Sequence, residues 1–414
     1  MVDSISPPTN LPQERRNFTH LVWDIAWFGV AMPATSRFLS VYAIRLGADA
    51  MVLGWLTALP AILALLSSAF AANWRRRFPS TVKAQVWPGL GFRLMFLLPA
   101  LTPFFPADWQ PLWLILAVSI PALPQGISAV IFLVLMREGV TGTRLTALLS
   151  RRMMAFNIAV LIGTLGFGFW LEEVTFPINY QIMFVVAFGV SLISLWNVGQ
   201  VRSVKLETLP DTTQPREHFW QLPGFQSLAF ILVMNYVAFF AIIPIIPLRL
   251  VDELGADEAF MSIFAVFELI SAALIAMLTN RIIERIGTRL TIALGMIGTG
   301  LAAIILGLTS DLYVTLIAAA LSGGTWTMAA IGLFAYFNEA TPEDNLTRYS
   351  TLYNQIVSLS VFVGPMLGSK LADTSLSLTT VLLMGAGLRL LVGVLTPYDL
   401  FGRPKRSKRS VPVT

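Results

Sequence analysis

The sequence predicts an all-α membrane protein with about twelve transmembrane helices. Three observations predict it: an apolar composition, apolar runs that recur along the chain, and basic residues that gather on one side of those runs. Of the 414 residues, 56% are hydrophobic and only 12% are charged, and the mean hydropathy is +0.73. A soluble protein carries roughly 25% charged residues, because its surface must face water. Too few charges remain here to coat a soluble globule, so lipid must serve as most of the solvent.

Apolar runs of membrane-spanning length, about 20 residues, recur through the chain with few gaps. In the first half we place them at 18–44, 50–72, 84–105, 111–136, 151–171 and 178–198. In the second half they lie at 219–248, 257–280, 289–309, 312–337, 350–371 and 376–396. Six runs in each half predict two bundles of six helices, which we number in chain order.

The basic residues predict the orientation of these helices. Of the 28 lysines and arginines, 22 fall in segments on the side of the amino terminus, three fall on the opposite side, and Arg37, Arg93 and Arg389 fall inside helices. Cytoplasmic loops carry such an excess, so both termini should face the cytoplasm of a multi-pass inner-membrane protein. The predicted parts are a cytoplasmic tail (1–17), an N-terminal bundle (18–198), a cytoplasmic linker (199–218), a C-terminal bundle (219–397) and a basic cytoplasmic tail (398–414).

Composition also argues against two other classes of protein. Basic runs such as Arg75–Arg77 are explained by orientation and by attraction to anionic lipid, so we expect no nucleic-acid partner. The chain has no cysteine and only two histidines, so we expect no metal site and no cofactor. A membrane-embedded enzyme would need a clustered nucleophile, base or metal, whereas the carboxylates here are isolated. We therefore expect a protein that is not an enzyme.

The two halves of the sequence repeat each other. Leu46–Asp49 and Leu254–Asp257 both read Leu-Gly-Ala-Asp, at an offset of 208 residues. Glu138, which ends helix 4, matches Glu339, which ends helix 10, at an offset of 201. Halves with six helices each and the same orientation are parallel repeats, related by an axis along the membrane normal. In such proteins the solute site lies near the midplane, between the halves.

A motif in the loop between helices 8 and 9 makes the chain similar to the major facilitator superfamily, whose loops 2–3 and 8–9 carry a string of glycine, acid and arginine. The second copy reads Asn280-Arg281-Ile282-Ile283-Glu284-Arg285-Ile286-Gly287-Thr288-Arg289. The first copy, Ala72-Asn73-Trp74-Arg75-Arg76-Arg77, keeps the bases but lacks the acid and the glycine. The resemblance covers all of the chain except its two tails. It implies two six-helix bundles that rock about a central cavity and open it alternately to each side.

The resemblance also implies a cytoplasmic gate, in which the acids that end helices 4 and 10 pair with arginines of the motif loops. For Glu138 the matching arginines are Arg75, Arg76 and Arg144. For Glu339 they are Arg285, Arg289 and Arg348, with Glu284 in the same motif. Such pairs bias two states if they exist in only one of them. The alternative is a solvated loop ion pair worth less than about 1 kcal/mol.

Helices 5 and 11 each carry small residues four apart, and this spacing puts each set on one face. The residues are Ala155, Ala159 and Gly163 in helix 5, and Ser360, Gly364 and Gly368 in helix 11. In the resembling family these helices line the interface between the halves, which implies a sliding contact. Static helix packing is the alternative.

Charges inside the predicted helices are candidates for proton coupling, because a charge at mid-bilayer costs at least roughly 2.5–3.5 kcal/mol. Glu268 lies near the middle of helix 8 among apolar residues, and Asp24 lies a quarter of the way into helix 1. Asp24 is about 20 Å along the helix from Arg37, so the two cannot pair. Asp24 either meets Arg93 or stands alone as a second proton carrier. The alternative for Glu268 is a structural hydrogen bond or ion pair.

The remaining candidates are polar and aromatic side chains in the helices that line the cavity of the resembling family. They are Arg37 in helix 1, Gln125 in helix 4, Asn235 and Tyr236 in helix 7, and Thr325 and Trp326 in helix 10. Amides and an indole on an apolar wall suit a small ligand of mixed polarity. Packing between helices is the alternative for each, and snorkelling to the interface is the alternative for Arg37.

These observations predict a secondary transporter that moves a small molecule by alternating access. We expect its partners to be the solute, protons or another coupling ion and the lipid bilayer, and we expect a monomer. Export of a lipophilic or amphipathic compound is preferred, because the cavity helices offer aromatic groups and few fixed charges; uptake of a metabolite is the alternative. A transporter-like sensor or assembly factor without transport is the second hypothesis.

Overall fold

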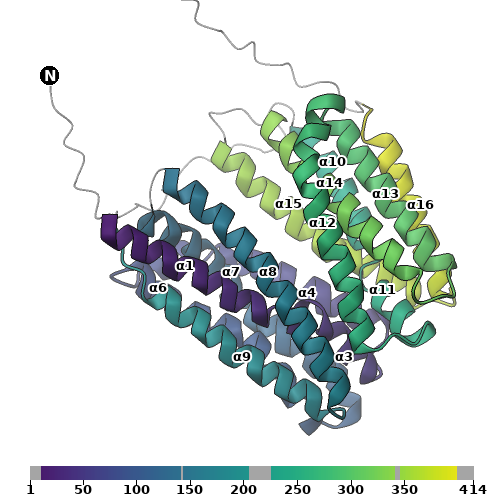
Figure 1. Cartoon of the computed structure of the whole chain (residues 1–414), viewed down its shortest axis with the longest axis horizontal. Helices are drawn as coiled ribbons and strands as arrows, with labels where there is room; N and C mark the ends of the chain where they lie inside the picture. The colour runs from purple at the N-terminus through teal and green to yellow at the C-terminus, as the bar shows by residue number, and fades with distance from the viewer. Residues whose placement is uncertain (1–10, 141–142, 205–224, 341–345, 399–414) are drawn as a thin grey trace, which may run out of the picture. The chain divides into compact units, whose positions relative to one another are not determined.

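The computed structural model describes residues 11–140, 143–204, 225–340 and 346–398, which form helices and no strand (Figure 1). Most of the predicted linker and tails lies outside these residues. The helices of the first half are α1 (Leu11–Ala31), α2 (Pro33–Ser36), α3 (Phe38–Arg45), α4 (Ala50–Ser68), α5 (Ala71–Arg75), α6 (Thr81–Arg93), α7 (Gln110–Gly139), α8 (Thr143–Glu173) and α9 (Ile178–Gly199), with the short 3₁₀ turns η1 (Leu94–Phe96), η2 (Leu98–Phe104) and η3 (Ala107–Trp109). Those of the second half are α10 (Phe225–Phe240), α11 (Ile245–Leu248), the π-helical η5 (Arg249–Glu253), α12 (Glu258–Ile286), α13 (Thr288–Leu308), α14 (Thr315–Ala340), α15 (Leu346–Ala372) and α16 (Leu378–Leu395).

The chain divides into two compact units that largely follow the two halves of the sequence. Unit 1 contains Met1–Asp211, Pro244–Val266 and Ala372–Ser375. Unit 2 contains Thr212–Ile243, Phe267–Leu371 and Leu376–Thr414. The segment Pro244–Val266, which holds α11 and the first turns of α12, therefore packs with the first half although it belongs to the second. The bundle boundaries at 18–198 and 219–397 stay a prediction.

Membrane-spanning length and composition are confirmed for ten helices within the described residues. The other two predicted spans, 18–44 and 84–105, are helical but interrupted. In the first, Pro33 has no amide hydrogen to donate to the carbonyl of Gly29, and the chain breaks between α1 and α2. In the second, α6 ends at Arg93 and 3₁₀ turns follow. Pro99 and Pro103 of η2 have no amide hydrogen to donate, so the α-helical hydrogen bonds cannot continue there.

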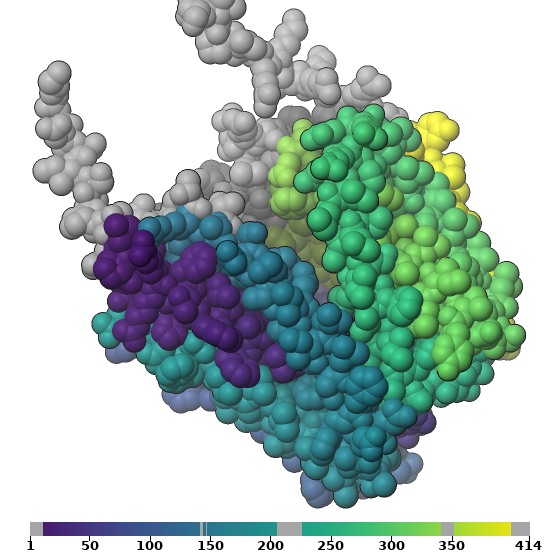
Figure 2. Space-filling model, in the orientation of Figure 1, coloured from purple at the N-terminus to yellow at the C-terminus, as the bar shows by residue number. Residues whose placement is uncertain are grey.

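Helix packing repeats between the two units, as the sequence repeat predicts. In unit 1, α1 packs against α8 and α9, and α6 packs against α7 and α9. In unit 2, α10 packs against α16, and α13 packs against α14 and α16, which are the equivalent neighbours. On the face shown in Figure 2, the side chains of α1 (purple) lie along those of α8 (blue). The fold is therefore all-helical, with two units built on one packing pattern.

Glycines of helices 5 and 11 allow close contacts with helices 1 and 7, respectively. A methyl group added at Gly163 of α8 would lie 2.4 Å from the carbonyl oxygen of Val30 in helix 1. A methyl group added at Gly368 of α15 would lie 1.7 Å from the carbonyl oxygen of Ala241 in helix 7. Only glycine lets these backbones approach so closely. These contacts of Gly163 and Gly368 lie inside each unit.

The repeated Leu-Gly-Ala-Asp sequences form two similar turns. Gly47 and Gly255 have φ angles of 81° and 72°, in the left-handed region that favours glycine. Asp49 then caps α4 by accepting a hydrogen bond from the Val52 amide at 2.8 Å. Asp257 does the same for α12 at the Phe260 amide, at 2.6 Å. We call the end of unit 1 where these turns lie the loop end.

Candidate functional site

The carboxylate of Asp24 lies in a buried network inside unit 1. Arg152 donates to Oδ2 at 3.0 Å, and Ser194 donates to Oδ1 at 2.7 Å. A second guanidinium, that of Arg93, lies 3.8 Å from Oδ1 and also donates to Ser194. Of the two alternatives that the sequence leaves for Asp24, the structure therefore shows the contact with Arg93. Proton uptake by Asp24 would remove the only carboxylate that these two guanidiniums contact among the described residues.

Arg152 corrects the count of cytoplasmic charges. The sequence counts it among the basic residues on the side of the amino terminus, at the first turn of the predicted span 151–171, but α8 already begins at Thr143 and Arg152 is buried within it. Its guanidinium also donates to the carbonyl of Leu21 and lies over the ring of Phe132. Sequence reasoning missed this residue as a partner of Asp24, because α8 begins before the apolar run and Arg152 lies about two and a half turns inside it.

Arg389 of α16, one of the three basic residues inside the predicted helices, is buried in unit 2. Its guanidinium donates to the carbonyls of Ala238, Phe239 and Thr299. The first two belong to the last turn of α10, which ends at Phe240 inside a predicted span. The last carbonyls of a helix lack amide partners within it, and in lipid such groups must be satisfied by protein. Arg389 thus caps the broken helix 7, where a cation also suits the helix dipole.

Glu268 lies in α12 at a close contact with α14. It is half-buried, and a methyl group added at Gly323 would lie 2.2 Å from its carbonyl oxygen. The next residue, Gly324, faces Ser271 of α12 in the same way. The Gly323-Gly324 pair therefore allows α12 and α14 to approach around the acid, and all of these residues belong to unit 2.

Tyr236 and Trp326 come together in an aromatic cluster of unit 2. Their rings meet edge to face at 5.6 Å, and Phe239 stacks on Trp326 at 3.5 Å. The hydroxyl of Tyr236 lies 3.0 Å from that of Tyr353 in α15. Sequence reasoning missed Tyr353. A sequence feature that could have pointed to it is the mean hydropathy of its span, Leu352–Ala372, which at 1.3 is the lowest of the ten membrane-spanning helices in the described residues. Three helices, α10, α14 and α15, thus bring aromatic faces and paired hydroxyls to one place.

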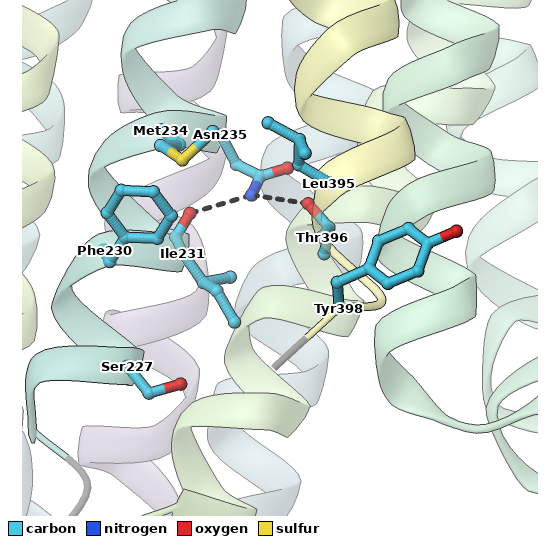
Figure 3. Close-up of a pocket in the computed structure, with 8 residues that line it drawn as sticks. All are labelled: Ser227, Phe230, Ile231, Met234, Asn235, Leu395, Thr396 and Tyr398. Carbon is cyan, nitrogen blue, oxygen red and sulfur yellow. Dashed lines mark hydrogen bonds between the residues drawn. The ribbon is translucent and has the colours of Figure 1, made fainter. Parts of the chain in front are cut away.

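Asn235, although adjacent to Tyr236, faces away from this cluster. Its amide nitrogen donates to Ile231 at 2.8 Å and to Thr396 at 3.3 Å, beyond the end of α16 (Figure 3). It lines a small pocket of about 10 Å³, which has room for about one water molecule. The pocket residues are Ser227, Phe230, Ile231, Met234, Asn235, Leu395, Thr396 and Tyr398. Asn235 and Tyr236 therefore face different helices, because consecutive helical residues point about 100° apart, and contact of Asn235 with a solute stays a prediction.

The other predicted cavity residues separate in the same way. Thr325 donates to Leu321 in its own helix, and its side chain packs on Gly298 of α13. Gln125 is half-buried in α7 and makes no hydrogen bond to another described residue. Arg37 lies at the break between α2 and α3 and is half-buried. Thr325 is thus a packing residue, whereas Gln125 and Arg37 stay candidates for contact with a solute.

The acids that end helices 4 and 10 have equivalent partners. Thr81 donates to Glu138 at 2.7 Å, and Thr288 donates to Glu339. Arg75 lies 3.9 Å from Glu138, which is one of the predicted pairs. Ser203, at the start of the linker, also donates to Glu138 at 2.8 Å. All the described partners of Glu138 belong to unit 1, so the acid ties a motif loop and the linker to the end of α7.

The other predicted gate arginines have different surroundings. Arg144 pairs with Glu14 at 3.1 Å and not with Glu138. Arg289 donates to the hydroxyl of Tyr336 at 3.1 Å and lies over its ring. Arg76 and Arg285 are exposed, and so is Glu284, the acid of the second motif copy. The side chain of Arg348 lies outside the described part of the chain.

Comparison with known proteins agrees with this architecture. Residues 228–414 match the family model of the Major Facilitator Superfamily. A tetracycline resistance protein of class H from Pasteurella multocida is 23% identical over 148 residues, which are 35% of this chain and 36% of that protein. The chain thus aligns with little more than a third of that relative.

Solved structures share the fold over nearly the whole chain. An auto-inhibited peptide transporter of the POT family matches with a TM-score of 0.72 at 12% identity, covering 94% of this chain and 99% of that one. The nucleoside transporter NupG matches with a TM-score of 0.65 at 13% identity, covering 94% and 100%. A bacterial homologue of the human lysosomal transporter Spinster matches with a TM-score of 0.65 at 13% identity, covering 95% of both chains. The second half of the chain is therefore similar to the Major Facilitator Superfamily, and nearly the whole chain shares the fold of these solved transporters.

Proposed function

We propose that the chain is a proton-coupled secondary transporter that exports small amphipathic compounds by alternating access. It acts as a monomer in the inner membrane, with both termini in the cytoplasm. The observation that carries the proposal is Glu268, a carboxyl group within the span Glu258–Ile286, whose mean hydropathy is 2.3. An ionised group at mid-bilayer costs at least about 2.5–3.5 kcal/mol. Binding and release of a proton lets such an acid change its charge as the cavity changes sides.

Glu268 suits this role better than Asp24. Asp24 contacts two guanidiniums and a serine hydroxyl, and a proton there would leave both buried cations without their carboxylate. Glu268 instead lies against Gly323, one helical turn from Trp326 in α14. A proton taken up at Glu268 would therefore act next to the aromatic cluster. Asp24 becomes a structural anion in this proposal.

The solute class follows from the groups that the structure brings together. Aromatic faces of Tyr236 and Trp326, with the paired hydroxyls of Tyr236 and Tyr353, suit a solute with a planar apolar part and a few hydrogen-bonding groups. In unit 1, Arg37 lies at the break in helix 1. Irregular backbone in membrane proteins is tolerated where it is buried in protein or lines a cavity, so Arg37 and Gln125 are proposed as solute contacts of their own unit.

Export is favoured by the relative among the resistance proteins. Resistance to a drug is a phenotype that export would produce, and that relative is named for resistance to tetracycline. The solved structures of peptide and nucleoside transporters support uptake of a metabolite as the alternative direction and solute. The hypothesis of a sensor without transport has no observation in its favour.

The acids Glu138 and Glu339 keep their proposed role at the cytoplasmic ends of the helices. Each accepts a hydrogen bond from a threonine that begins the helix after a motif loop, Thr81 of α6 for Glu138 and Thr288 of α13 for Glu339. Because Ser203 shares Glu138, we propose that the gate includes the first residues of the linker. Breaking this contact would free the linker end together with the motif loop.

Transport by purified protein in proteoliposomes tests the proposal. The panel should contain planar amphipathic drugs, nucleosides and dipeptides, each measured with and without an imposed pH gradient. We expect accumulation of at least one amphipathic compound that depends on the gradient. Transport of nucleosides or peptides alone would contradict the solute class, and equal transport without the gradient would contradict proton coupling.

A further inference from the structure

Four side chains form a stripe along one face of α1 in unit 1, and α1 (purple) lies on the face shown in Figure 2. They are Arg16, His20, Trp23 and Trp27. Their spacing of four, three and four residues keeps them within about 60° around the helix axis. Arg16 is exposed, Trp23 is 54% exposed, and the rings of Trp23 and Trp27 stack with centroids 6.4 Å apart. The stripe therefore begins with a cation and ends in an aromatic shelf.

Helix α9 borders this stripe and fixes the orientation of its histidine. The amide nitrogen of Asn197 donates to the carbonyl of Ile193 at 3.0 Å, so the amide oxygen accepts from Nδ1 of His20 at 2.9 Å. Nε2 of His20 makes no hydrogen bond with a described residue. The ring of Trp196, which is 61% exposed, meets that of His20 edge to face at 6.1 Å. The held imidazole thus keeps one nitrogen for a ligand, and this nitrogen donates when the ring is protonated.

The internal repeat does not require this stripe. At the offset of 208 residues that relates the two Leu-Gly-Ala-Asp turns, its first three residues correspond to Gly224, Leu228 and Ile231. Leu228 and Ile231 are buried in α10 of unit 2. The second half therefore builds the equivalent helix without a histidine or a tryptophan at these places. The stripe was added to one half of a duplicated scaffold, which favours a role other than folding.

The order of the groups along α1 matches the layers of a bilayer leaflet. The stripe lies at the start of helix 1, away from the loop end of unit 1. Arg16 precedes the predicted span 18–44, and Trp23 lies about 10 Å further along the axis. The headgroup region of one leaflet is about 5–7 Å thick. Arg16 therefore lies at the depth of lipid phosphates, whereas Trp23 and Trp27 reach the acyl chains.

We propose that this stripe on α1, with its neighbour on α9, binds one anionic phospholipid. The phosphate lies between the guanidinium of Arg16 and Nε2 of His20. An acyl chain lies on the rings of Trp23 and Trp27, beside Trp196. Interfacial tryptophans alone anchor a helix without selecting a lipid, whereas the cation and the oriented histidine select negative charge. The proposed orientation of the chain puts the site in the cytoplasmic leaflet. Neither the solute nor proton coupling plays a part in it.

Native mass spectrometry of the purified full chain tests the proposal. The protein in detergent is titrated with phosphatidylglycerol or with phosphatidylcholine, and the fraction that carries one lipid is measured. We expect phosphatidylglycerol to bind on the order of tenfold more tightly. Arg16→Gln should weaken its binding about fivefold, and Arg16→Gln with His20→Leu should bind both lipids equally. The leucine is the residue that the second half carries at the equivalent position.

The matched control is Arg15→Gln. It removes the same charge from the next exposed residue, which points about 100° away from Arg16, and should leave the preference for phosphatidylglycerol unchanged. Thermal unfolding in lipid-free detergent shows that each variant is folded.

Three outcomes would overturn the proposal. The first is equal binding of the two lipids by the unchanged protein. The second is an equal loss in Arg15→Gln and Arg16→Gln, because the preference would then follow net charge. The third is a preference that persists in the double variant of Arg16 and His20, which would place the lipid elsewhere. Lipid binding is measured without transport, so these outcomes are separate from the test of the proposed function.

Discussion

Arg152 contacts Asp24 at 3.0 Å across 128 residues of sequence, and it does so inside a membrane protein where both groups are nearly free of solvent contact. The pair joins α8 to α1, and Arg93 and Ser194 bring α6 and α9 to the same carboxylate. Four helices of unit 1 therefore depend on one anion. In our proposal this network makes Asp24 a structural anion.

Replacement of Asp24 by Asn should destabilise the protein strongly. Removing one partner of a buried ion pair typically costs about 3–5 kcal/mol, because the other charge stays buried and uncompensated. Thermal unfolding in detergent measures the loss, with Glu284→Gln as a control at an exposed acid. Combining Asp24→Asn with Arg152→Gln should cost less than the sum of the two single changes. Additive losses would show that the two residues are not coupled.

Arg389→Met should also lower stability, by at least about 2 kcal/mol, since buried carbonyls left without partners cost about 1–3 kcal/mol each. Arg389→Lys should fail to rescue it, because an ammonium cannot reach Ala238, Phe239 and Thr299 with the spread of a guanidinium. The exposed Arg285→Met is the matched control. Full stability of the lysine variant would contradict the capping of α10.

Gly323→Ala should separate α12 from α14. The added methyl group would lie 2.2 Å from the carbonyl of Glu268, so the helices must shift, at a cost of about 1–3 kcal/mol. Gly387→Ala in α16 is the control, because a methyl group there meets open space. Alanine at that position should be neutral or stabilising by up to about 1 kcal/mol. If both changes have the same effect on unfolding, the close contact at Gly323 does not exist.

Tyr353→Phe should change solute affinity without unfolding the protein. It removes the hydroxyl that lies 3.0 Å from that of Tyr236 but keeps the ring and its contacts with Phe337. Loss of one hydrogen-bonding partner near a ligand corresponds to roughly a threefold to tenfold rise in the KM of a polar aromatic solute. Tyr313→Phe, at an exposed residue, is the control. An unchanged KM for every transported compound would remove Tyr353 from the solute site.

The general fold was predictable because lipid imposes simple rules on sequence. Apolar runs of fixed length indicate most of the spans, and the equal spacing of Leu46–Asp49 and Leu254–Asp257 indicates the repeat. The helix breaks near Pro33 and Arg93 were harder to predict, because apolar content does not show where proline interrupts the helical hydrogen bonds. The structure breaks both of these predicted spans into pieces, and it also interrupts the span 219–248 between α10 and α11.

The candidate site was less predictable, because side-chain direction depends on packing. Asn235 and Tyr236 are neighbours in the sequence and face different helices. Arg152 was counted with the cytoplasmic basic residues, and Arg389 fell inside a predicted helix. The sequence does not show the carboxylate that Arg152 contacts or the carbonyls to which Arg389 donates. Residues joined across more than a hundred positions leave no signal in one sequence.

The central claim is that Glu268 carries the coupled proton, and transport by Glu268→Gln in proteoliposomes tests it most directly. The measurement compares accumulation driven by a pH gradient with exchange of labelled for unlabelled solute, which needs no gradient. We expect the glutamine variant to lose accumulation and to keep exchange. Accumulation at the level of the unchanged protein would contradict the account.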